Sequence, residues 1–148
     1  MKRPIRLAVR AIILNENRLL LVNAWKNHDK LWCAPGGGAE THQSLHENLI
    51  REIYEETGLT IAVGMPCLVN EFHDPKSSFH QVDIYFRCKI MDGDPFGEWI
   101  DTEGVVSKRQ WVTREELAFL NVKPDSLAAV AWRDPDAPAY DPLEPIQF

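Results

Sequence analysis

The sequence has few cysteines, no long apolar run and no cluster of basic residues, and each absence excludes a class of protein. The three cysteines are an odd number without C-x-x-C spacing, which argues against a disulfide framework or zinc site and favours a reducing cytoplasm. No apolar stretch approaches the roughly 18 residues of a membrane span, so we expect no membrane partner. Arginines interrupt residues 5–14, which excludes a signal-peptide core.

The net charge of −6 excludes a further class, because an acidic protein without a basic face repels the phosphates of DNA and RNA. A small anionic ligand can still bind if a divalent cation bridges the two. The 148 residues, 45% of them apolar and 26% charged, fit one globular domain. We predict this domain over residues 1–132, followed by a Pro-rich tail over residues 133–148 that runs extended over the surface.

Apolar and polar residues alternate in several stretches, and this pattern predicts strands. The predicted strands are residues 5–14, 18–25, 61–72, 81–90 and 105–112, the last of them the final strand of the chain. The composition of residues 35–38, Pro-Gly-Gly-Gly, predicts neither strand nor helix. A capping box at Thr113 and Glu116 opens a short helix, and residues 125–132 predict a further helical turn. The order of elements predicts an α+β sandwich around a mixed sheet.

Residues 45–57 form the clearest predicted helix. Ser44 and Glu47 make an S-x-x-E capping box before it, and Gly58 is a natural stop after it. No glycine or proline interrupts the segment. At about 100° per residue, one face carries a predicted core stripe. The stripe consists of Leu45, Leu49, Ile50 and Ile53.

Acidic residues lie at the margin of that stripe instead of opposite it. Glu52 and Glu56 are one turn apart, so we expect them to be partly desolvated and to repel each other. Arg51 can pair with Glu55, but that pair does not relieve Glu52 against Glu56. Mg²⁺ takes carboxylate oxygens together with waters and substrate phosphates, so a cation at this helix edge would offset the repulsion.

The glycine run before the helix supports a cation or phosphate site. Gly36, Gly37 and Gly38 let the backbone approach a ligand closely because no Cβ is in the way. A carbonyl of this turn is then a further candidate ligand. On spacing alone, an ordinary surface helix with Glu/Arg pairs beneath a generic turn remains an alternative.

Residues 37–59 resemble the signature of the Nudix family, G-x5-E-x7-R-E-U-x-E-E-x-G-U, in which U is aliphatic. Eight of the nine specified positions match. They are Gly37, Arg51, Glu52, Ile53, Glu55, Glu56, Gly58 and Leu59. The exception is Gln43, where the signature has Glu. The resemblance covers roughly residues 5–120 and implies a Nudix-type α/β/α sandwich around a mixed β-sheet.

The resemblance also implies a reaction, which is metal-dependent hydrolysis of the pyrophosphate bond of a nucleoside diphosphate linked to another group. The implied cofactor is Mg²⁺, with Mn²⁺ as a substitute. Its implied ligands are Glu52, Glu55, Glu56 and the carbonyl of Gly37. Arg51 would orient Glu55, and Glu52 would be the general base. A further acid from a late loop is expected to be Glu103, with Glu98 as the second choice.

Substrate recognition is predicted less sharply. The candidate binding residues are Arg10, His28, Lys30 and Gly38. Aromatic residues are favoured as core packing over base stacking; they are Trp25, Trp32, Phe72, Phe79 and Tyr85. Pro75 follows Leu59 by sixteen residues, which resembles ADP-ribose-cleaving members. We therefore rank ADP-ribose or a nucleotide sugar above a nucleoside triphosphate, and expect a monomer or homodimer that binds no nucleic-acid polymer.

Two alternatives share this fold. Gln43 favours a module that binds a nucleotide without cutting it, although the Arg51-Glu52 and Glu55-Glu56 pairs argue against that. Cys33, close to the signature, is compatible with an isomerase acting on a prenyl diphosphate. Gln43 is not expected to be a metal ligand, so its lost charge should weaken support for the ligands without abolishing activity.

Overall fold

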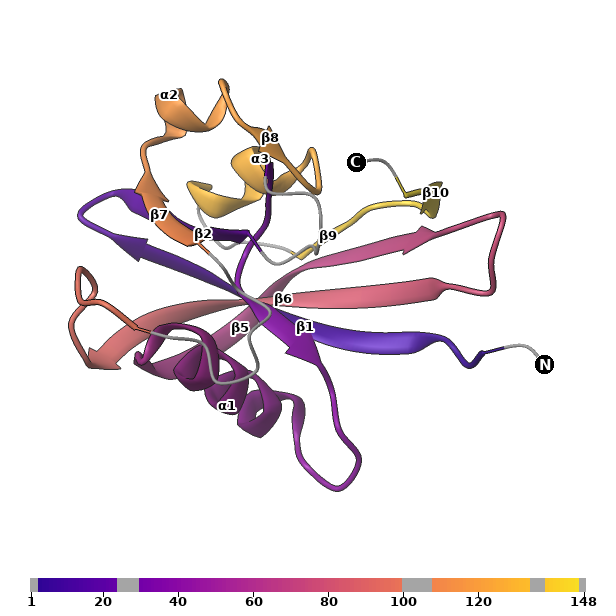
Figure 1. Ribbon diagram of the computed structural model, residues 1–148, viewed down its shortest axis with the longest axis horizontal. Helices are drawn as coiled ribbons and strands as arrows, with labels where there is room; N and C mark the ends of the chain where they lie inside the picture. Colours follow the sequence, from indigo (N-terminus) through magenta and orange to yellow (C-terminus); the bar gives the residue numbers. More distant parts are fainter. Residues whose placement is uncertain (1–2, 24–29, 100–107, 134–137, 147–148) are drawn as a thin grey trace.

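A mixed β-sheet organises the protein, whose computed structural model describes residues 3–23, 30–99, 108–133 and 138–146 (Figure 1). Within this part of the chain the sheet has the order β10-β5-β6-β1-β2-β7, in which β10 is Glu144–Pro145. Its longer strands are β1 (Arg6–Asn15), β2 (Arg18–Asn23), β5 (Thr60–His73), β6 (His80–Asp92) and β7 (Lys108–Val112). The pairing of β1 with β6 is parallel, whereas β1 with β2 and β5 with β6 are antiparallel.

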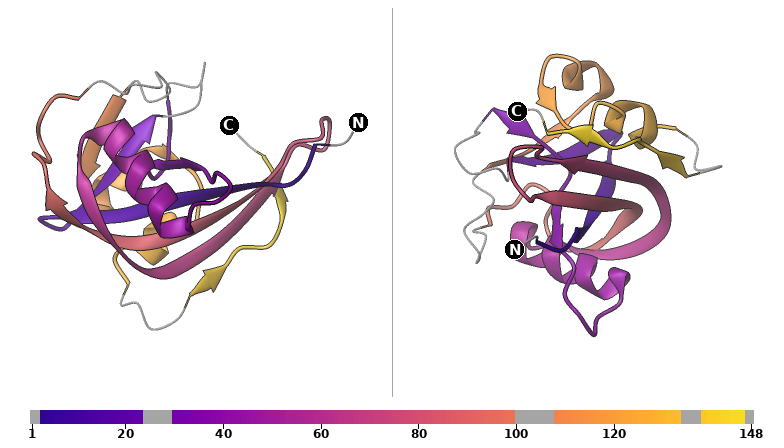
Figure 2. Two further views of the ribbon diagram at one scale, coloured as in Figure 1. Left: turned by 90° about the horizontal axis from the view of Figure 1, so that it is seen from below. Right: turned by 90° about the vertical axis from the view of Figure 1, so that its right-hand side faces the viewer.

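Helices cover both faces of the sheet. Helix α1 (Leu45–Thr57) packs on one face, and α2 (Arg114–Leu117) and α3 (Leu127–Ala131) lie on the other (Figures 1 and 2). One apolar cluster contains Leu49 and Ile53 of α1, and a second contains Leu127 of α3. The predicted α/β/α sandwich is therefore confirmed. Among the residues that the structure describes, no helix is long and apolar enough to cross a bilayer.

Local signals set the ends of α1, as predicted. The Ser44 hydroxyl accepts a hydrogen bond from the backbone N–H of Glu47 at 3.0 Å. Gly58 ends the helix at φ 76°, a left-handed conformation that glycine adopts at little cost. The Arg109 guanidinium donates to the Thr57 carbonyl at 2.6 Å, so a cation from β7 also stabilises the negative end of the helix dipole. Strand β7 thereby fixes α1 against the sheet.

The core stripe of α1 is rotated relative to the predicted one. Leu49 is fully buried, but Ile50 is 38% exposed, and Asn48 is buried. Asn48 is enclosed because its Oδ1 accepts from the Glu40 N–H at 2.8 Å and its Nδ2 donates to the Ser44 carbonyl at 2.8 Å. The segment before the helix therefore folds onto Asn48, a tertiary contact that a helical wheel cannot predict.

The glycine run is a strand, contrary to the prediction that this composition would form neither strand nor helix. Strand β4 (Gly36–Gly38) pairs antiparallel with β1, with Gly36 opposite Arg10. The approach is so close that a Cβ on Gly36, at φ +153°, would lie 2.0 Å from the Val9 carbonyl oxygen. Glycine is thus required by the pairing itself, and β4 runs directly between β1 and α1.

The C-terminal part of the chain adds strands that the sequence did not predict. Strand β8 (Asn121–Val122) pairs with β3 (Leu31–Trp32), and the tail strands β9 (Ala139–Tyr140) and β10 (Glu144–Pro145) pair in parallel with β5. The segment predicted as the final strand is therefore not the last. The tail is extended, as expected, but joins the edge of the sheet.

The rotated stripe of α1 yields a test of the fold. We expect Leu49→Ala to lower the free energy of unfolding by about 2–5 kcal/mol, because it removes buried contacts and leaves a cavity. Ile50→Ala, one residue along the same helix, should cost about 1 kcal/mol or less because its side chain is already partly hydrated. Urea denaturation of both variants measures the difference. Equal losses would contradict the observed orientation of α1.

Candidate functional site

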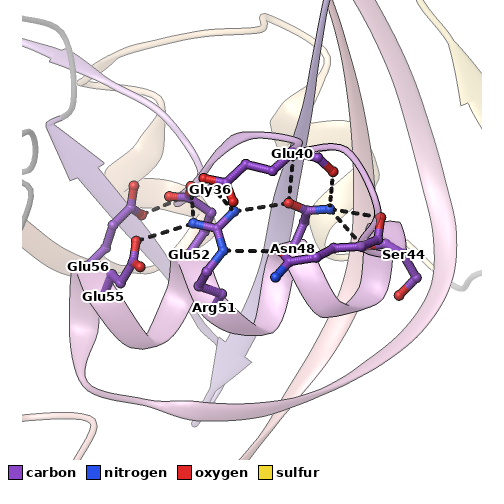
Figure 3. A network of polar contacts seen from close by, with 9 residues as sticks. Gly36, Glu40, Ser44, Asn48, Arg51, Glu52, Glu55 and Glu56 are labelled. Atoms are coloured by element: carbon purple, nitrogen blue, oxygen red, sulfur yellow. Dashed lines mark hydrogen bonds and ion pairs between the residues drawn. The ribbon is translucent and has the colours of Figure 1, made fainter.

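Three glutamates lie along the edge of α1 that faces the glycine strand (Figure 3). Glu56 is 6% exposed, and its Oε2 accepts a hydrogen bond from the backbone N–H of Gly36 at 3.0 Å. The Glu52 carboxyl lies against Gly37, where an added Cβ would be 2.5 Å from its carboxyl carbon. Glu55 lies about one helical turn beyond Glu52 along α1 and is partly exposed. The predicted desolvation of Glu52 and Glu56 at this edge is confirmed.

Arg51 holds two of these carboxylates (Figure 3). Its Nη1 donates to Glu52 Oε1 at 3.1 Å and to Glu55 Oε2 at 3.5 Å. Its Nη2 donates to the buried Asn48 Oδ1 at 3.0 Å, which fixes the guanidinium from the other side. The expected pair with Glu55 is confirmed, but the expectation that Arg51 leaves Glu52 unrelieved was wrong, because one guanidinium nitrogen reaches both acids.

Gln43, the departure from the signature, contacts Arg51 and not the carboxylates. Its Oε1 accepts from Arg51 Nε at 3.4 Å, and Glu40 approaches the same guanidinium at 3.8 Å. Gln43 therefore acts on the glutamates only through Arg51. A neutral amide at this position leaves more of the Arg51 charge available to Glu52 and Glu55 than a carboxylate would.

The electrostatics of the edge favour an added cation. Burial raises the pKa of Glu52 above its ordinary value, although the charge and hydrogen bond of Arg51 lower it in part. Arg51 bonds to Glu52 and Glu55 but carries a single positive charge, so these two carboxylates together keep a net negative charge. Within the described ranges, however, no three or more His, Cys, Asp or Glu side chains converge as a ready-made metal site. A cation would compete with Arg51 for Glu52 and Glu55.

The residues nonetheless fit a hard divalent cation. Carboxylate and backbone carbonyl oxygens are the ligands that Mg²⁺ takes in proteins, usually beside several waters. Gly37 has no side chain to occupy the space in which the Glu52 carboxyl lies. The candidate donors are the carboxylates of Glu52, Glu55 and Glu56 and the carbonyl of Gly37.

A pocket opens on the opposite face of the sheet from α1. Its cavity volume is about 60 Å³, and its mouth is open to solvent. Its lining includes Arg10, Asn70, Phe72, Asp83 and Tyr85. The core packing predicted for Tyr85 is confirmed, since it is 2% exposed and belongs to an apolar cluster; Tyr85 and the partly buried Phe72 also line this pocket.

Arg10 joins this pocket to the acidic edge. Its Nε lies 3.3 Å from Asp83 Oδ1, and its Nη1 donates to the Ala34 carbonyl at 3.2 Å. Burial by itself lowers the pKa of the Arg10 guanidinium, but Asp83 and weaker neighbours including Glu56 outweigh it and raise that pKa. The guanidinium is therefore a fixed positive charge between the pocket and the helix acids.

Arg10 apart, the sequence did not single out the polar residues in and beside the pocket. Gln81 Nε2 donates to Asp83 Oδ1 at 2.9 Å, and Arg6 bonds to Gln81 from the neighbouring strand. Asn70 lies on β5 and is buried. A signal was present, since Gln81 and Asp83 are polar at alternate positions of the strand, with the apolar Val82 between them. Such a strand face would need buried partners.

Other predicted site residues have different positions. Gly38 lies beside the Arg6 guanidinium, and Lys30 is in an exposed turn before β3. Glu98 is exposed. His28 and Glu103 lie outside the described residues. Cys33, considered for isomerase chemistry, is buried in the pocket wall, with its Sγ 4.0 Å from Arg10 Nη1.

The fold and the acidic helix edge are those of a Nudix domain, and the family profile of the NUDIX domain matches residues 4–133. The chain belongs to this family. Over 88 residues it is 35% identical to the putative ADP-ribose pyrophosphatase YjhB of Bacillus subtilis, covering 57% of this chain and 41% of that protein. It is 28% identical over 101 residues to human diphosphoinositol polyphosphate phosphohydrolase 3-alpha, covering 68% and 58%. The matches thus span about half the length of these relatives.

Solved structures show the same fold. A NUDIX hydrolase from Nitrosomonas europaea aligns with a TM-score of 0.71 at 22% identity, covering 99% of this chain and 81% of that chain. An ADP-ribose pyrophosphatase from Streptococcus suis aligns with a TM-score of 0.67 at 20% identity, covering 92% and 98%. A UDP-X diphosphatase aligns with a TM-score of 0.68 at 23% identity, covering 95% and 69%.

Because Gly37 lies against the Glu52 carboxyl, a side chain at position 37 should weaken cation binding. In Gly37→Ala the new methyl group should displace the flexible Glu52 carboxyl and weaken Mg²⁺ binding by about tenfold or more, with little loss of stability. Gly38→Ala is the control, because its methyl group meets only the Arg6 guanidinium. Calorimetric titration with Mg²⁺ compares the two. Equal affinities would show that Glu52 is no ligand.

A substitution at Gln43 should leave Mg²⁺ binding equal or make it tighter. Gln43→Glu places a carboxylate beside Arg51 and should draw the guanidinium away from Glu52 and Glu55. We expect Mg²⁺ to bind equally or more tightly in the same titration, because the released carboxylates become available to the cation. Weaker binding would contradict the assignment of Gln43 to Arg51.

Proposed function

We propose that this protein hydrolyses the pyrophosphate bond of a nucleoside diphosphate linked to another group, with ADP-ribose or a nucleotide sugar as the preferred substrate and a nucleoside triphosphate next. The observation that carries the proposal is the row of three carboxylates on α1, pressed against a glycine strand and ordered by one arginine. A purely structural helix gains nothing from gathering these acids, since their repulsion costs stability.

The residues that would hold a divalent cation are Glu52, Glu55, Glu56 and the carbonyl of Gly37. When bound, Mg²⁺ or Mn²⁺ would neutralise charge on the pyrophosphate and lower the pKa of a bound water. The protein supplies the geometry. Gly36 fixes Glu56 through its backbone N–H, and Arg51 restrains Glu52 and Glu55 from the other side.

Glu52 is the proposed general base. Its Oε1 accepts from Arg51, so Oε2 takes the proton from the attacking water. Burial raises the pKa of Glu52, the direction that makes a carboxylate a better proton acceptor. Glu103 stays the proposed additional acid from a late loop.

The balanced charge of the pocket lining favours binding of an uncharged part of the substrate. Its charged lining residues are two cations, Arg10 and Lys123, and two acids, Asp83 and Glu144. This balance suits the hydroxyls and π faces of a nucleoside or sugar. An inositol polyphosphate needs an excess of cations, so a substrate like that named for the human relative is disfavoured. The names of the ADP-ribose pyrophosphatase and UDP-X diphosphatase relatives agree with this preference.

The proposed location is the cytoplasm. Cys33, Cys67 and Cys88 are buried free thiols, a state that a reducing compartment maintains. The predicted assembly, a monomer or a homodimer, remains a prediction.

Glu56→Gln tests the proposed reaction. The amide oxygen can still accept from Gly36, so we expect the fold to persist while turnover with Mg²⁺ falls by about 10²-fold or more. Glu47→Gln, an exposed position on the same helix, removes the same charge and should leave turnover unchanged. Coupled phosphate release measures both variants, and circular dichroism checks their folding. Full activity of Glu56→Gln would count against the site.

A substrate screen separates hydrolysis from the two alternatives. Wild-type protein with Mg²⁺ or Mn²⁺ is given ADP-ribose, nucleotide sugars, dinucleoside polyphosphates, nucleoside triphosphates and isopentenyl diphosphate. Hydrolysis of ADP-ribose or a nucleotide sugar is the expected result. Nucleotide binding without cleavage would identify a binding module, and isomerisation of isopentenyl diphosphate would identify the Cys33 alternative; either outcome overturns the proposal.

A further inference from the structure

The C-terminal tail lies beyond the part of the chain that the family profile matches, which ends at residue 133. It nevertheless joins the sheet, since β9 and β10 pair in parallel with β5 (Figure 2). The tail thus lies outside the matched domain but next to the pocket, where it can contact a molecule bound there.

Polar contacts fix the tail along its length. The Asp141 carboxylate accepts from Asn70 at 2.9 Å and from Ser126 at 2.7 Å, and its backbone N–H donates to the Val69 carbonyl at 2.9 Å. Further along, the Ile146 N–H donates to the His73 carbonyl at 2.8 Å. Residues 141–146 are thus anchored at both ends.

The anchored segment forms one wall of the pocket. Glu144, Pro145 and Ile146 line it from the tail, and Lys123 and Pro124 line it from the loop after β8. Glu144 is opposite Phe72 in the parallel register, and paired residues of adjacent strands point to the same face of a sheet. The Glu144 side chain therefore shares the pocket face with Phe72.

Glu144 differs from the other charged groups of the pocket. Asp83 is neutralised by Arg10, and Lys123 pairs with Asp125 at 3.1 Å. Glu144 has no ion-pair partner among the residues that the structure describes. A carboxylate in this position accepts hydrogen bonds from a sugar diol, as acidic residues do for ribose hydroxyls in dinucleotide sites. The same charge repels a phosphate attached to that sugar.

We propose that the tail is a specificity element in which Glu144 selects an unmodified sugar over a phosphorylated one. This inference rests on the proposed function, because it requires the pocket to receive the sugar or nucleoside end of the substrate. The wall made by residues 144–146 positions the sugar, and the Glu144 carboxylate binds its hydroxyls.

The test compares matched substrates in the full-length protein. ADP-ribose is compared with ADP-ribose 2′-phosphate and ADP-ribose 1″-phosphate, which carry the extra phosphate on one ribose or the other. Should another nucleotide sugar be cleaved faster, it and its sugar-phosphorylated derivatives replace these. The measured quantity is the ratio of kcat/KM for the plain substrate to that for each derivative.

We expect Glu144→Gln to lower this ratio by about fivefold for one of the two derivatives, and Glu144→Lys to lower it further, through a higher KM for the plain substrate and a lower KM for the phosphorylated one. Glu115→Gln, an exposed acid on α2, is the control and should leave both ratios as in the wild type. Unchanged ratios in both Glu144 variants, with an active wild type, would overturn the role of the tail alone. An inactive wild type would overturn the proposed function as well.

Discussion

The repulsion among the α1 carboxylates, and the groups that hold them together despite it, is the interaction on which the rest of the structure depends. Glu56 is fixed by the backbone of Gly36, and Glu52 is fixed by Arg51 and by contact with Gly37. Both restraints require β4 to run along β1 close to the helix. Glycine is needed because any side chain on Gly36 would collide with the Val9 carbonyl. The strand pairing of the sheet and the acidic edge of the helix are therefore one arrangement.

The two faces of the sheet have complementary roles in this account. The face beneath α1 carries the acids that suit a cation, and the opposite face carries a pocket with balanced charge. Arg10 connects them, because its guanidinium is paired with Asp83 in the pocket and is influenced by the field of Glu56. A substrate with a charged pyrophosphate and an uncharged sugar or nucleoside matches this division. The tail then adds a wall and one acid to the pocket side.

The features predictable from the sequence are those encoded locally. Ser44 and Gly58 specify the ends of α1 within a few residues of chain, and the signature around Arg51 identifies the family. The strand nature of Gly36–Gly38 was not predictable from composition, because it depends on the open edge of β1. The exposure of Ile50 depends on a segment that folds back onto Asn48. These errors come from tertiary contacts that override local propensity.

The pocket was the largest omission, because its residues come from strands and loops far apart in the sequence. The most direct test of a cation site at the edge of α1 is a crystal structure of the protein grown with Mn²⁺, in which anomalous scattering locates the ion without assumptions about its ligands. The account predicts the strongest anomalous peak between the carboxylates of Glu52 and Glu56 and the glycine strand. A peak only at other surface acids, with this edge still closed around Arg51, would contradict it.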